Sequence, residues 1–350
     1  MLLNYCAASA LMHEDGKVVG LRCEDRESGR SFALQAGCVV NATGVWVDEL
    51  RQQDGQAMGR VVRPMVAPSQ GVHLVVDSSF LGGDHALLVP RTADGRVLFA
   101  VPWLGKTILG TTDTPREDVV REPRAFADEV AFILGESARY LTRAPERADV
   151  RSAWVGLRPL VRPQNEDGED TKALSREHTV LAGRSGLVTV TGGKWTTYRA
   201  MAEDVLDKCF ERGLLARRGG GVTVRLPLVG APVAGQALQP VSAPPGLHGY
   251  GSEQAAVQAL PGAGRALGGG LTEAMVRFAV RHEYARSVED VLARRSRQLF
   301  LDARLAADLG GPVAALLRDE GVSEPRLDEF LALARQYASL PPAPATRGAV

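Results

Sequence analysis

The sequence lacks the features that mark three large classes of protein. Forty-one basic residues balance forty-one acidic ones, so no net field draws the chain to nucleic acid. No apolar run reaches the ~18 residues that a membrane-spanning helix needs. Cys6, Cys23, Cys38 and Cys209 form no CxxC pair and have no histidine at metal-ligand spacing. We therefore expect no nucleic-acid partner, no spanning helix and no metal.

A secretory signal is also missing from the first residues, which lack its charged, apolar and small-residue order. Together with four cysteines that we interpret as reduced thiols, this predicts a cytoplasmic location. The length of 350 residues, 45% of them hydrophobic and 23% charged, suits a globular protein of two or three domains. The expected partner is a small molecule or another protein.

Period-two alternation dominates the first third of the chain and predicts strands. Asp15-Gly16 is a turn signal that predicts a hairpin between the first two runs. Asp94-Gly95 and Leu104-Gly105 predict further hairpins in a mostly antiparallel sheet. The β-like runs cover residues 4–13, 18–25, 32–44 and 62–113, and the third of them ends in VVNATG before a helical pattern.

Two segments have the 3.6-residue spacing of an amphipathic helix. Residues 123–142 carry an apolar stripe on a charged segment, which predicts one helix against the sheet. Residues 271–309 are predicted to be helical throughout, with Ser287 and Asp290 close to a capping box.

The stretch TVTGGKWTTYRAMAEDVL, residues 189–206, ends a strand on two glycines and then begins a helical pattern. A helix N-terminus carries unpaired N–H groups and about half a positive charge, so it stabilises an anion. Gly192 and Gly193 would let a ligand approach the backbone, and Lys194 adds a full charge beside Thr196 and Thr197. A capped helix after a glycine turn is an equally open interpretation.

Two arginines and one histidine are further candidates. Arg158 and Arg176 lie near strand ends, and a guanidinium binds phosphate or carboxylate through two parallel hydrogen bonds. For either arginine alone, a surface ion pair is the commoner role. His73 lies in the apolar run PSQGVHLVVD and could accept a proton near neutrality, although a satisfied core histidine is commoner there.

Together these motifs resemble the FAD-dependent glycerol-3-phosphate dehydrogenases, especially the aerobic, respiratory type. The family's motifs occur here in the family's order: VVNATG, PSQGVHLVV, DGRVLFAVPW, ILGTTDTP, WVGLRPL, SREHTV and VTGGKWTTYRAMAEDV. The segment AVRHEYARSVEDVLARRSRQLFLDAR resembles the family's C-terminal helical domain. The resemblance covers most of residues 4–305.

The resemblance implies oxidation of sn-glycerol 3-phosphate to dihydroxyacetone phosphate, with hydride transfer to FAD and electrons passing to a membrane quinone. Arg158, Arg176 and Lys194 would bind the phosphate or polarise the substrate oxygen, and His73 would lie near the reacting hydroxyl as base or orienter. Two segments would contact FAD: Ala42, Thr43 and Gly44 the adenosine diphosphate half, and Gly192, Gly193, Lys194, Trp195, Thr196 and Thr197 the isoalloxazine.

The fold implied is mixed α+β and α/β. It is the remainder of an FAD-dependent oxidoreductase fold of the glucose-oxidase and D-amino-acid-oxidase kind, with an antiparallel substrate-domain sheet and an all-helical C-terminal domain. The predicted parts are an FAD-binding remainder (1–60), the substrate sheet (61–180), a return to the FAD domain (181–215), an irregular linker (216–270), the helical domain (271–338) and a disordered tail (339–350).

One family element does not occur in the sequence: the strand–GxGxxG–helix unit that admits the FAD pyrophosphate. We therefore expect a chain without that N-terminal unit, and two other functions stay open. One is a glycerophosphate oxidase that passes electrons to oxygen, and the other is an inactive remnant that serves as a binding module. The resemblance also implies peripheral contact with the inner face of the cytoplasmic membrane, with a homodimer as an open alternative.

Overall fold

The computed structural model describes residues 1–92, 95–162 and 177–344. The predicted turn residue Asp94 and the predicted site residue Arg176 lie outside the described residues. The chain divides into two compact units, and the division falls within the long strands β5 (Val66–Asp77) and β10 (Ser152–Val161). The first unit contains residues 1–70, 113–121 and 157–226, and the second contains residues 71–112, 122–156 and 227–350.

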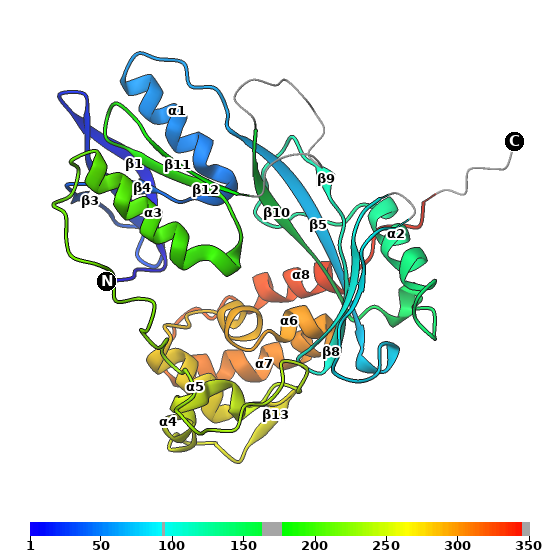
Figure 1. The fold of residues 1–350 in the computed structure, drawn as a ribbon. Helices are drawn as coiled ribbons and strands as arrows, with labels where there is room; N and C mark the ends of the chain where they lie inside the picture. Colours follow the sequence, from blue (N-terminus) through cyan, green and yellow to red (C-terminus); the bar gives the residue numbers. More distant parts are fainter. Residues whose placement is uncertain (93–94, 163–176, 345–350) are drawn as a thin grey trace, which may run out of the picture. The chain divides into compact units, whose positions relative to one another are not determined.

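A three-stranded antiparallel meander opens the first unit (Figure 1). Asp15 and Gly16 have φ of 46° and 72°, as a two-residue hairpin turn requires, so the predicted hairpin is confirmed. One face of the meander packs into a small core, in which Leu11, Val18 and Leu21 contact Val39. The strands are β1 (Cys6–Glu14), β2 (Lys17–Asp25) and β3 (Ser31–Gln35).

The second sheet of this unit has the order β11-β12-β4, with β12 parallel to β4. Helix α3 covers one face of it, because Val205 and Cys209 pack with Val188 and Val190. The third β-run predicted, residues 32–44, is divided between the two sheets. The elements are β4 (Val40–Asn41), α1 (Val47–Ala57), β11 (His178–Ala182), β12 (Val188–Gly192) and α3 (Tyr198–Glu211).

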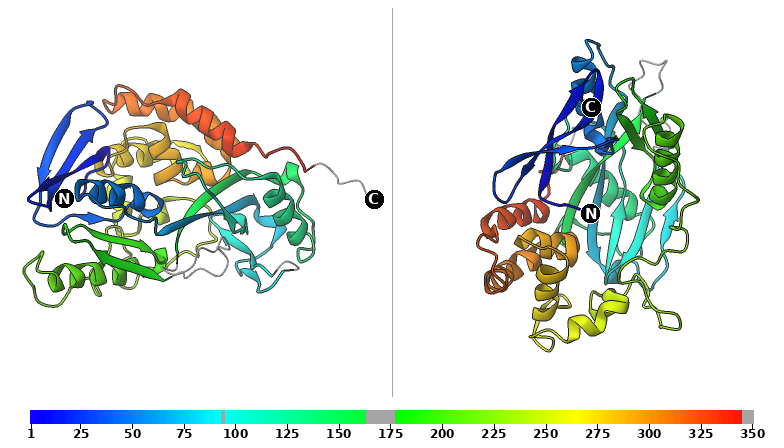
Figure 2. Two further views of the ribbon diagram at one scale, coloured as in Figure 1. Left: turned by 90° about the horizontal axis from the view of Figure 1, so that it is seen from above. Right: turned by 90° about the vertical axis from the view of Figure 1, so that its left-hand side faces the viewer.

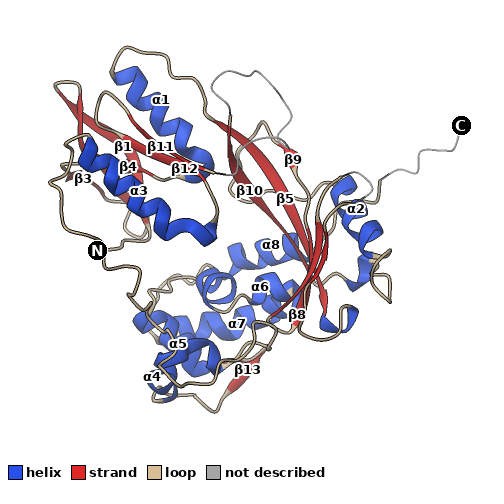
Figure 3. Cartoon of the chain, viewed as in Figure 1, coloured by secondary structure: helices blue, strands red, loops and turns tan. Residues whose placement is uncertain are grey.

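The larger sheet has the strand order β10-β5-β8-β7-β6, with β9 pairing to β5, and Figure 3 labels β10, β5, β9 and β8 among its red strands. Alternation on β5 turns Val72, Leu74 and Val76 toward α2, where Val130 and Ile133 complete a core. The antiparallel sheet and its helix are therefore confirmed, although the helix is shorter than predicted. The bounds are β6 (Leu87–Val89), β7 (Leu98–Trp103), β8 (Lys106–Gly110), β9 (Thr114–Pro115) and α2 (Ala127–Ser137).

The C-terminal helices of the second unit share one large core, and both views of Figure 2 show these yellow-to-red helices lying together. The prediction of one continuous helical run over residues 271–309 is wrong, because Tyr284 and Arg297 have left-handed φ of 53° and 63° and interrupt it. Ser287 and Asp290 do cap each other's backbone N–H, each at 3.1 Å. The elements are α4 (Gln254–Gln258), β13 (Ala266–Gly268), β14 (Leu271–Thr272), α5 (Glu273–His282), a π-turn (Asp290–Arg295), α6 (Gln298–Leu301), α7 (Ala303–Asp319) and α8 (Leu327–Ala338).

The described residues were compared with what a membrane-spanning helix and a metal site require. In residues 1–92, 95–162 and 177–344, none of the helices has the length and hydropathy that a membrane crossing requires. The same ranges contain no group of three or more His, Cys, Asp or Glu side chains that could hold a metal ion.

Candidate functional site

The two segments predicted to contact a cofactor follow neighbouring parallel strands. Val40 pairs with Val188 and Asn41 with Thr189, so β4 and β12 run side by side in the same direction. The carboxyl ends of neighbouring parallel strands lie at one edge of a sheet, which is where ligands bind in open α/β sheets. The structure therefore brings the turn at 42–44 and the turn at 192–197 to the same edge of the first unit.

The turn after β4 is held by a buried asparagine that the sequence analysis did not single out. Asn41 is 1% exposed, and its side-chain amide donates to the carbonyl of Val47 at 2.9 Å. The Thr43 hydroxyl donates to Asn41 Oδ1 at 2.8 Å. Gly44 has a φ of 62°, and a Cβ added there would meet no atom within 4 Å. The turn formed by Ala42, Thr43 and Gly44 thus leaves open space beside Gly44, which an approaching ligand would need.

The two glycines at the end of β12 are confined by neighbouring atoms, unlike Gly44. Gly192 and Gly193 have φ of 76° and 73°. A Cβ on Gly192 would lie 2.6 Å from the carbonyl oxygen of Glu177, and one on Gly193 would lie 2.7 Å from Met201 Sδ. The chain's own packing therefore accounts for both glycines, and their contact with a cofactor stays a prediction.

The helix that follows these glycines begins later in the chain than the sequence predicted. Lys194 caps a 3-10 turn formed by Trp195, Thr196 and Thr197, and α3 begins only at Tyr198. The backbone N–H and the hydroxyl of Thr197 both donate to the Lys194 carbonyl at 3.0 Å. Trp195 is 85% exposed and stacks on Tyr198 with ring centroids 5.3 Å apart. The lysine and this aromatic pair are therefore accessible at the sheet edge.

Arg158, also in the first unit, forms an ion pair. Its guanidinium lies 3.7 Å from the Asp113 carboxylate, and the two side chains are 26% and 10% exposed. The hydroxyl of Ser69, which is fully buried, also donates to Asp113. The structure therefore shows that Arg158 forms an ion pair, one of the two roles that the sequence left open for it. Its partner is Asp113, which from its sequence position alone could equally be a turn residue.

His73 belongs to the second unit, where it is half-buried on the face of β5 opposite Val72 and Leu74. Its imidazole stacks on the indole of Trp154 with centroids 4.1 Å apart and 18° between the ring planes. Phe99 lies on the other side at 5.8 Å. The predicted candidates are thus divided: Arg158 and Lys194 lie in the first unit and His73 in the second.

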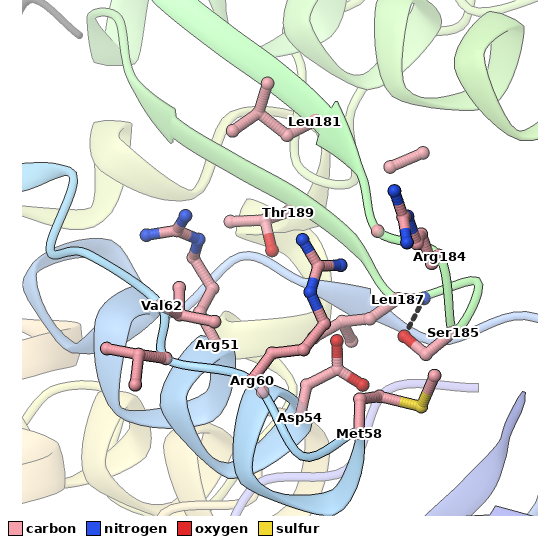
Figure 4. A pocket seen from close by; sticks show the side chains of 14 residues that line it. Arg51, Asp54, Met58, Arg60, Val62, Leu181, Arg184, Ser185, Leu187 and Thr189 are labelled. Carbon is pink, nitrogen blue, oxygen red and sulfur yellow. Dashed lines mark hydrogen bonds between the residues drawn. The ribbon is translucent and has the colours of Figure 1, made fainter. Parts of the chain in front are cut away.

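A cavity of about 330 Å³ lies in the first unit between α1 with its following loop and the β11–β12 hairpin (Figure 4). Its polar lining includes Arg51, Asp54, Arg60, Arg184 and Thr189. The backbone of Leu187, at the hairpin, donates to the Ser185 hydroxyl at 3.3 Å. Of the residues predicted to bind substrate or cofactor, none that the structure describes lines this cavity.

Two family models match the chain in succession. The model of the FAD dependent oxidoreductases matches residues 2–199, and that of the C-terminal domain of alpha-glycerophosphate oxidase matches residues 221–323. The chain belongs to the FAD-dependent oxidoreductase family. Its similarity to named relatives is with the glycerol-3-phosphate dehydrogenases, so the family and the fold that the sequence motifs predicted are both confirmed.

The relatives show how much of a longer protein the chain resembles. The mitochondrial glycerol-3-phosphate dehydrogenase of Arabidopsis thaliana is 35% identical over 91% of this chain and 54% of its own length. A probable one from Caenorhabditis elegans is 38% identical over 88% of this chain and 45% of its own length. The X-ray structure of the Bacillus halodurans enzyme complexed with FAD has a TM-score of 0.74 at 26% identity, covering 96% of this chain and 70% of that one. The chain thus spans about half the length of the curated relatives it matches.

These relatives also correct the predicted location. The proteins from Arabidopsis thaliana, Schizosaccharomyces pombe, Rattus norvegicus and Bos taurus are named mitochondrial, which contradicts a cytoplasmic location. The physical reason for the error is that unpaired cysteines argue only against an oxidising compartment. They do not distinguish among reducing compartments.

Proposed function

We propose that this chain carries the substrate side and the flavin-facing turn of a glycerol-3-phosphate dehydrogenase that oxidises sn-glycerol 3-phosphate to dihydroxyacetone phosphate. The observation that carries the proposal is the common sheet edge of the 42–44 and 192–197 turns. The names of the relatives and the FAD bound in the Bacillus halodurans structure point to the same activity. When bound, FAD would accept the hydride from C2 of the substrate.

The residues of this chain would fit FAD through two turns of different character. The open space beside Gly44, with Thr43 before it, would admit the adenosine diphosphate half. The turn from Gly193 to Thr197 would face the ring edge that gains negative charge on reduction, where Lys194 and backbone N–H groups stabilise an anion.

The substrate roles follow from the charge and burial of three side chains. The Arg158 guanidinium has five N–H donors, so it can keep its ion pair with Asp113 and still present donors to a phosphate. The exposed Lys194 ammonium would add a second positive charge. Nδ1 of His73 is buried, so Nε2 is the ring nitrogen that would take the hydroxyl proton.

The first test measures FAD and substrate binding by the purified chain. We expect a yellow protein after FAD addition, whose flavin absorbance bleaches with glycerol 3-phosphate under anaerobic conditions. A protein that stays colourless with FAD and binds no glycerol 3-phosphate would instead support the inactive binding module. That outcome would refute the proposed oxidation by this chain.

The second test concerns the phosphate. Arg158→Ala should weaken glycerol 3-phosphate binding by ~1.5 kcal/mol or more, as loss of a charged hydrogen bond does, and hardly change glycerol binding. Arg139→Ala is the matched control, because that arginine is 57% exposed, lies just beyond the end of α2 in the second unit and pairs with Glu136. Equal losses for both ligands in calorimetric titrations would refute the phosphate role of Arg158.

The electron acceptor is a separate proposal. We favour a quinone because the relatives are named dehydrogenases, whereas the match to a glycerophosphate oxidase domain favours oxygen as the second candidate. Turnover with a soluble quinone analogue and no hydrogen peroxide would support the quinone. Peripheral contact with a membrane and a homodimer are further proposals from the resemblance, to be checked by liposome sedimentation and light scattering.

A further inference from the structure

The imidazole of His73 lies in a slot whose walls come from three other strands. Trp154 of β10 stacks on one side of the ring at 4.1 Å, with only 18° between the planes. Across β8 and β7, both His73 and Phe99 pair in register with Gly110. A Cβ on Gly110 would lie 2.7 Å from His73 Cδ2. The ring therefore fits between an indole face and a bare glycine.

The indole that forms one wall belongs to a strand, yet it packs into the helical core. Trp154 is partly buried against the cluster formed by the C-terminal helices. Phe300 of α6 meets its indole edge-on, at 5.6 Å and 86°, and Tyr337 of α8 meets Phe300 edge-on at 5.7 Å and 81°. The Tyr337 hydroxyl donates to the Glu122 carboxylate at 3.0 Å. A continuous series of ring contacts thus runs from α8 to His73.

The backbone beside Trp154 is attached to the same helices. The buried Ser152 hydroxyl donates to the carbonyl of Leu299 at 2.9 Å. The backbone N–H of Ala303, the first residue of α7, donates to the carbonyl of Arg151 at 3.1 Å. A displacement of α6 would therefore be transmitted to the start of β10, the strand that carries Trp154.

We propose that Trp154 and Phe300 are positioning residues through which the C-terminal helices set the orientation of the His73 imidazole. The proposal rests on the role proposed above for His73 as proton acceptor. Proton transfer needs the acceptor atom within hydrogen-bond reach, and a misplacement of about 1 Å can cost about a hundredfold in rate. The helical domain would thus control the geometry of the reaction without contacting the substrate.

The test follows the histidine ring signals of the full chain by NMR. Phe300→Leu should shift the His73 Hε1 and ring nitrogen signals, because the indole that shields them loses its support. Phe278→Leu is the matched control: Phe278 is buried in the same core, and its ring lies 4.7 Å from that of His282. That control should move the His282 signal and leave His73 unchanged, while His13 in the other unit serves as an internal reference.

A second pair of variants covers the case in which Phe300→Leu does not fold. Trp154→Phe keeps a ring against the imidazole and should keep the His73 signal close to that of an aromatic stack, whereas Trp154→Leu should lose it. In the flavin-loaded protein, Phe300→Leu should lower kcat about tenfold, part of what general base catalysis contributes, with little change in KM. Trp154→Phe should recover most of the kcat that Trp154→Leu loses.

The outcomes separate this inference from the proposed function. If folded Phe300→Leu and Trp154→Leu leave the His73 signals unchanged while His73→Gln abolishes oxidation of glycerol 3-phosphate, the positioning role is wrong and the proton-acceptor role stands. If the signals shift as expected but His73→Gln keeps full activity, the ring contacts hold the imidazole and the proton-acceptor role is wrong. Shifted signals with lost activity support both.

Discussion

Replacing Gly110 by alanine adds one methyl group at a tightly packed point of the larger sheet. The new Cβ would lie 2.7 Å from His73 Cδ2 and 3.1 Å from Phe99 Cζ. Real Cβ contacts are longer, so one ring must move. Trp154 blocks retreat of the imidazole on its far side. We therefore expect the added methyl group to strain the packing of His73 and Phe99.

The magnitude follows from two opposing effects. An extra methyl group in a well-packed core costs about 1–3 kcal/mol, whereas alanine in place of glycine reduces the entropy of the unfolded chain and returns about 0.4–1 kcal/mol. We expect Gly110→Ala to lower the free energy of unfolding by about 1.3 kcal/mol, the difference between the midpoints of these ranges.

The matched control is Gly135→Ala in α2 of the same unit, where a Cβ would meet no atom within 4 Å. Glycine inside a helix is unfavourable by about 0.8–1.0 kcal/mol relative to alanine, so this change should stabilise the unit. Urea unfolding gives the midpoints, and hydrogen exchange of peptides from β5 and β8 shows where the free energy changes. A Gly110→Ala protein as stable as the wild type would refute the slot around His73.

Two further predictions use the ionisable groups. The Arg151 guanidinium holds the pKa of Asp77 at about 2, and this carboxylate stabilises the fold above its unfolded pKa of about 3.9 and loses that effect as pH falls through 2. Because the Asp77 side chain is 36% exposed, we expect this loss to be about 1 kcal/mol, and Asp77→Asn should remove it from the pH dependence of thermal unfolding between pH 5 and 2. Burial, followed by the neighbouring Cys209 thiol 3.6 Å away, raises the pKa of Cys38 to about 11. Alkylation of Cys38 at pH 8, followed by peptide mass spectrometry, should therefore be roughly a hundredfold slower than in urea-unfolded protein, and equal rates would contradict the buried thiol.

Local patterns predicted those elements in which one face is buried. Strand β7 alternates buried and half-buried residues from Leu98 to Trp103, and its period-two pattern is visible in the sequence. The apolar stripe of α2 was equally clear, although the helix begins only after Phe126, whose backbone is extended with ψ of 155°. Burial on one face imposes a period on the residues, and a period can be read without knowing the partner.

The same patterns do not tell which sheet a strand joins. Residues 32–44 look like one strand, but β3 is exposed along its whole length beside β2, whereas β4 lies beside β12 from the other end of the unit. The breaks at Tyr284 and Arg297 were also missed, because these residue types carry no turn signal and seldom adopt the positive φ that they have here. Pairing and breaks of this kind depend on residues far away in the chain.

The candidate site shows the same division. The turns at 42–44 and 192–197 were predicted because glycine after a strand is a local signal. Asn41, which holds the first turn, and Trp154, which stacks on His73, were missed because their roles arise from contacts with Val47 and with the C-terminal helices. The pairing of Asp113 with Arg158 could not be read from spacing either.

The glycines sharpen this point, because one residue type serves two purposes that the sequence does not distinguish. At Gly192, Gly193 and Gly110 a Cβ would strike the chain itself, at 2.6 to 2.7 Å from the nearest atom. Gly44 shares a positive φ, at 62°, with Gly192 and Gly193, but the space beside it is open. A glycine next to a strand therefore argues for a ligand only where the space that its missing Cβ leaves is empty. By that criterion the VVNATG turn supports cofactor approach more strongly than the GGK turn, whose support comes from the exposed Lys194 and the helix start instead.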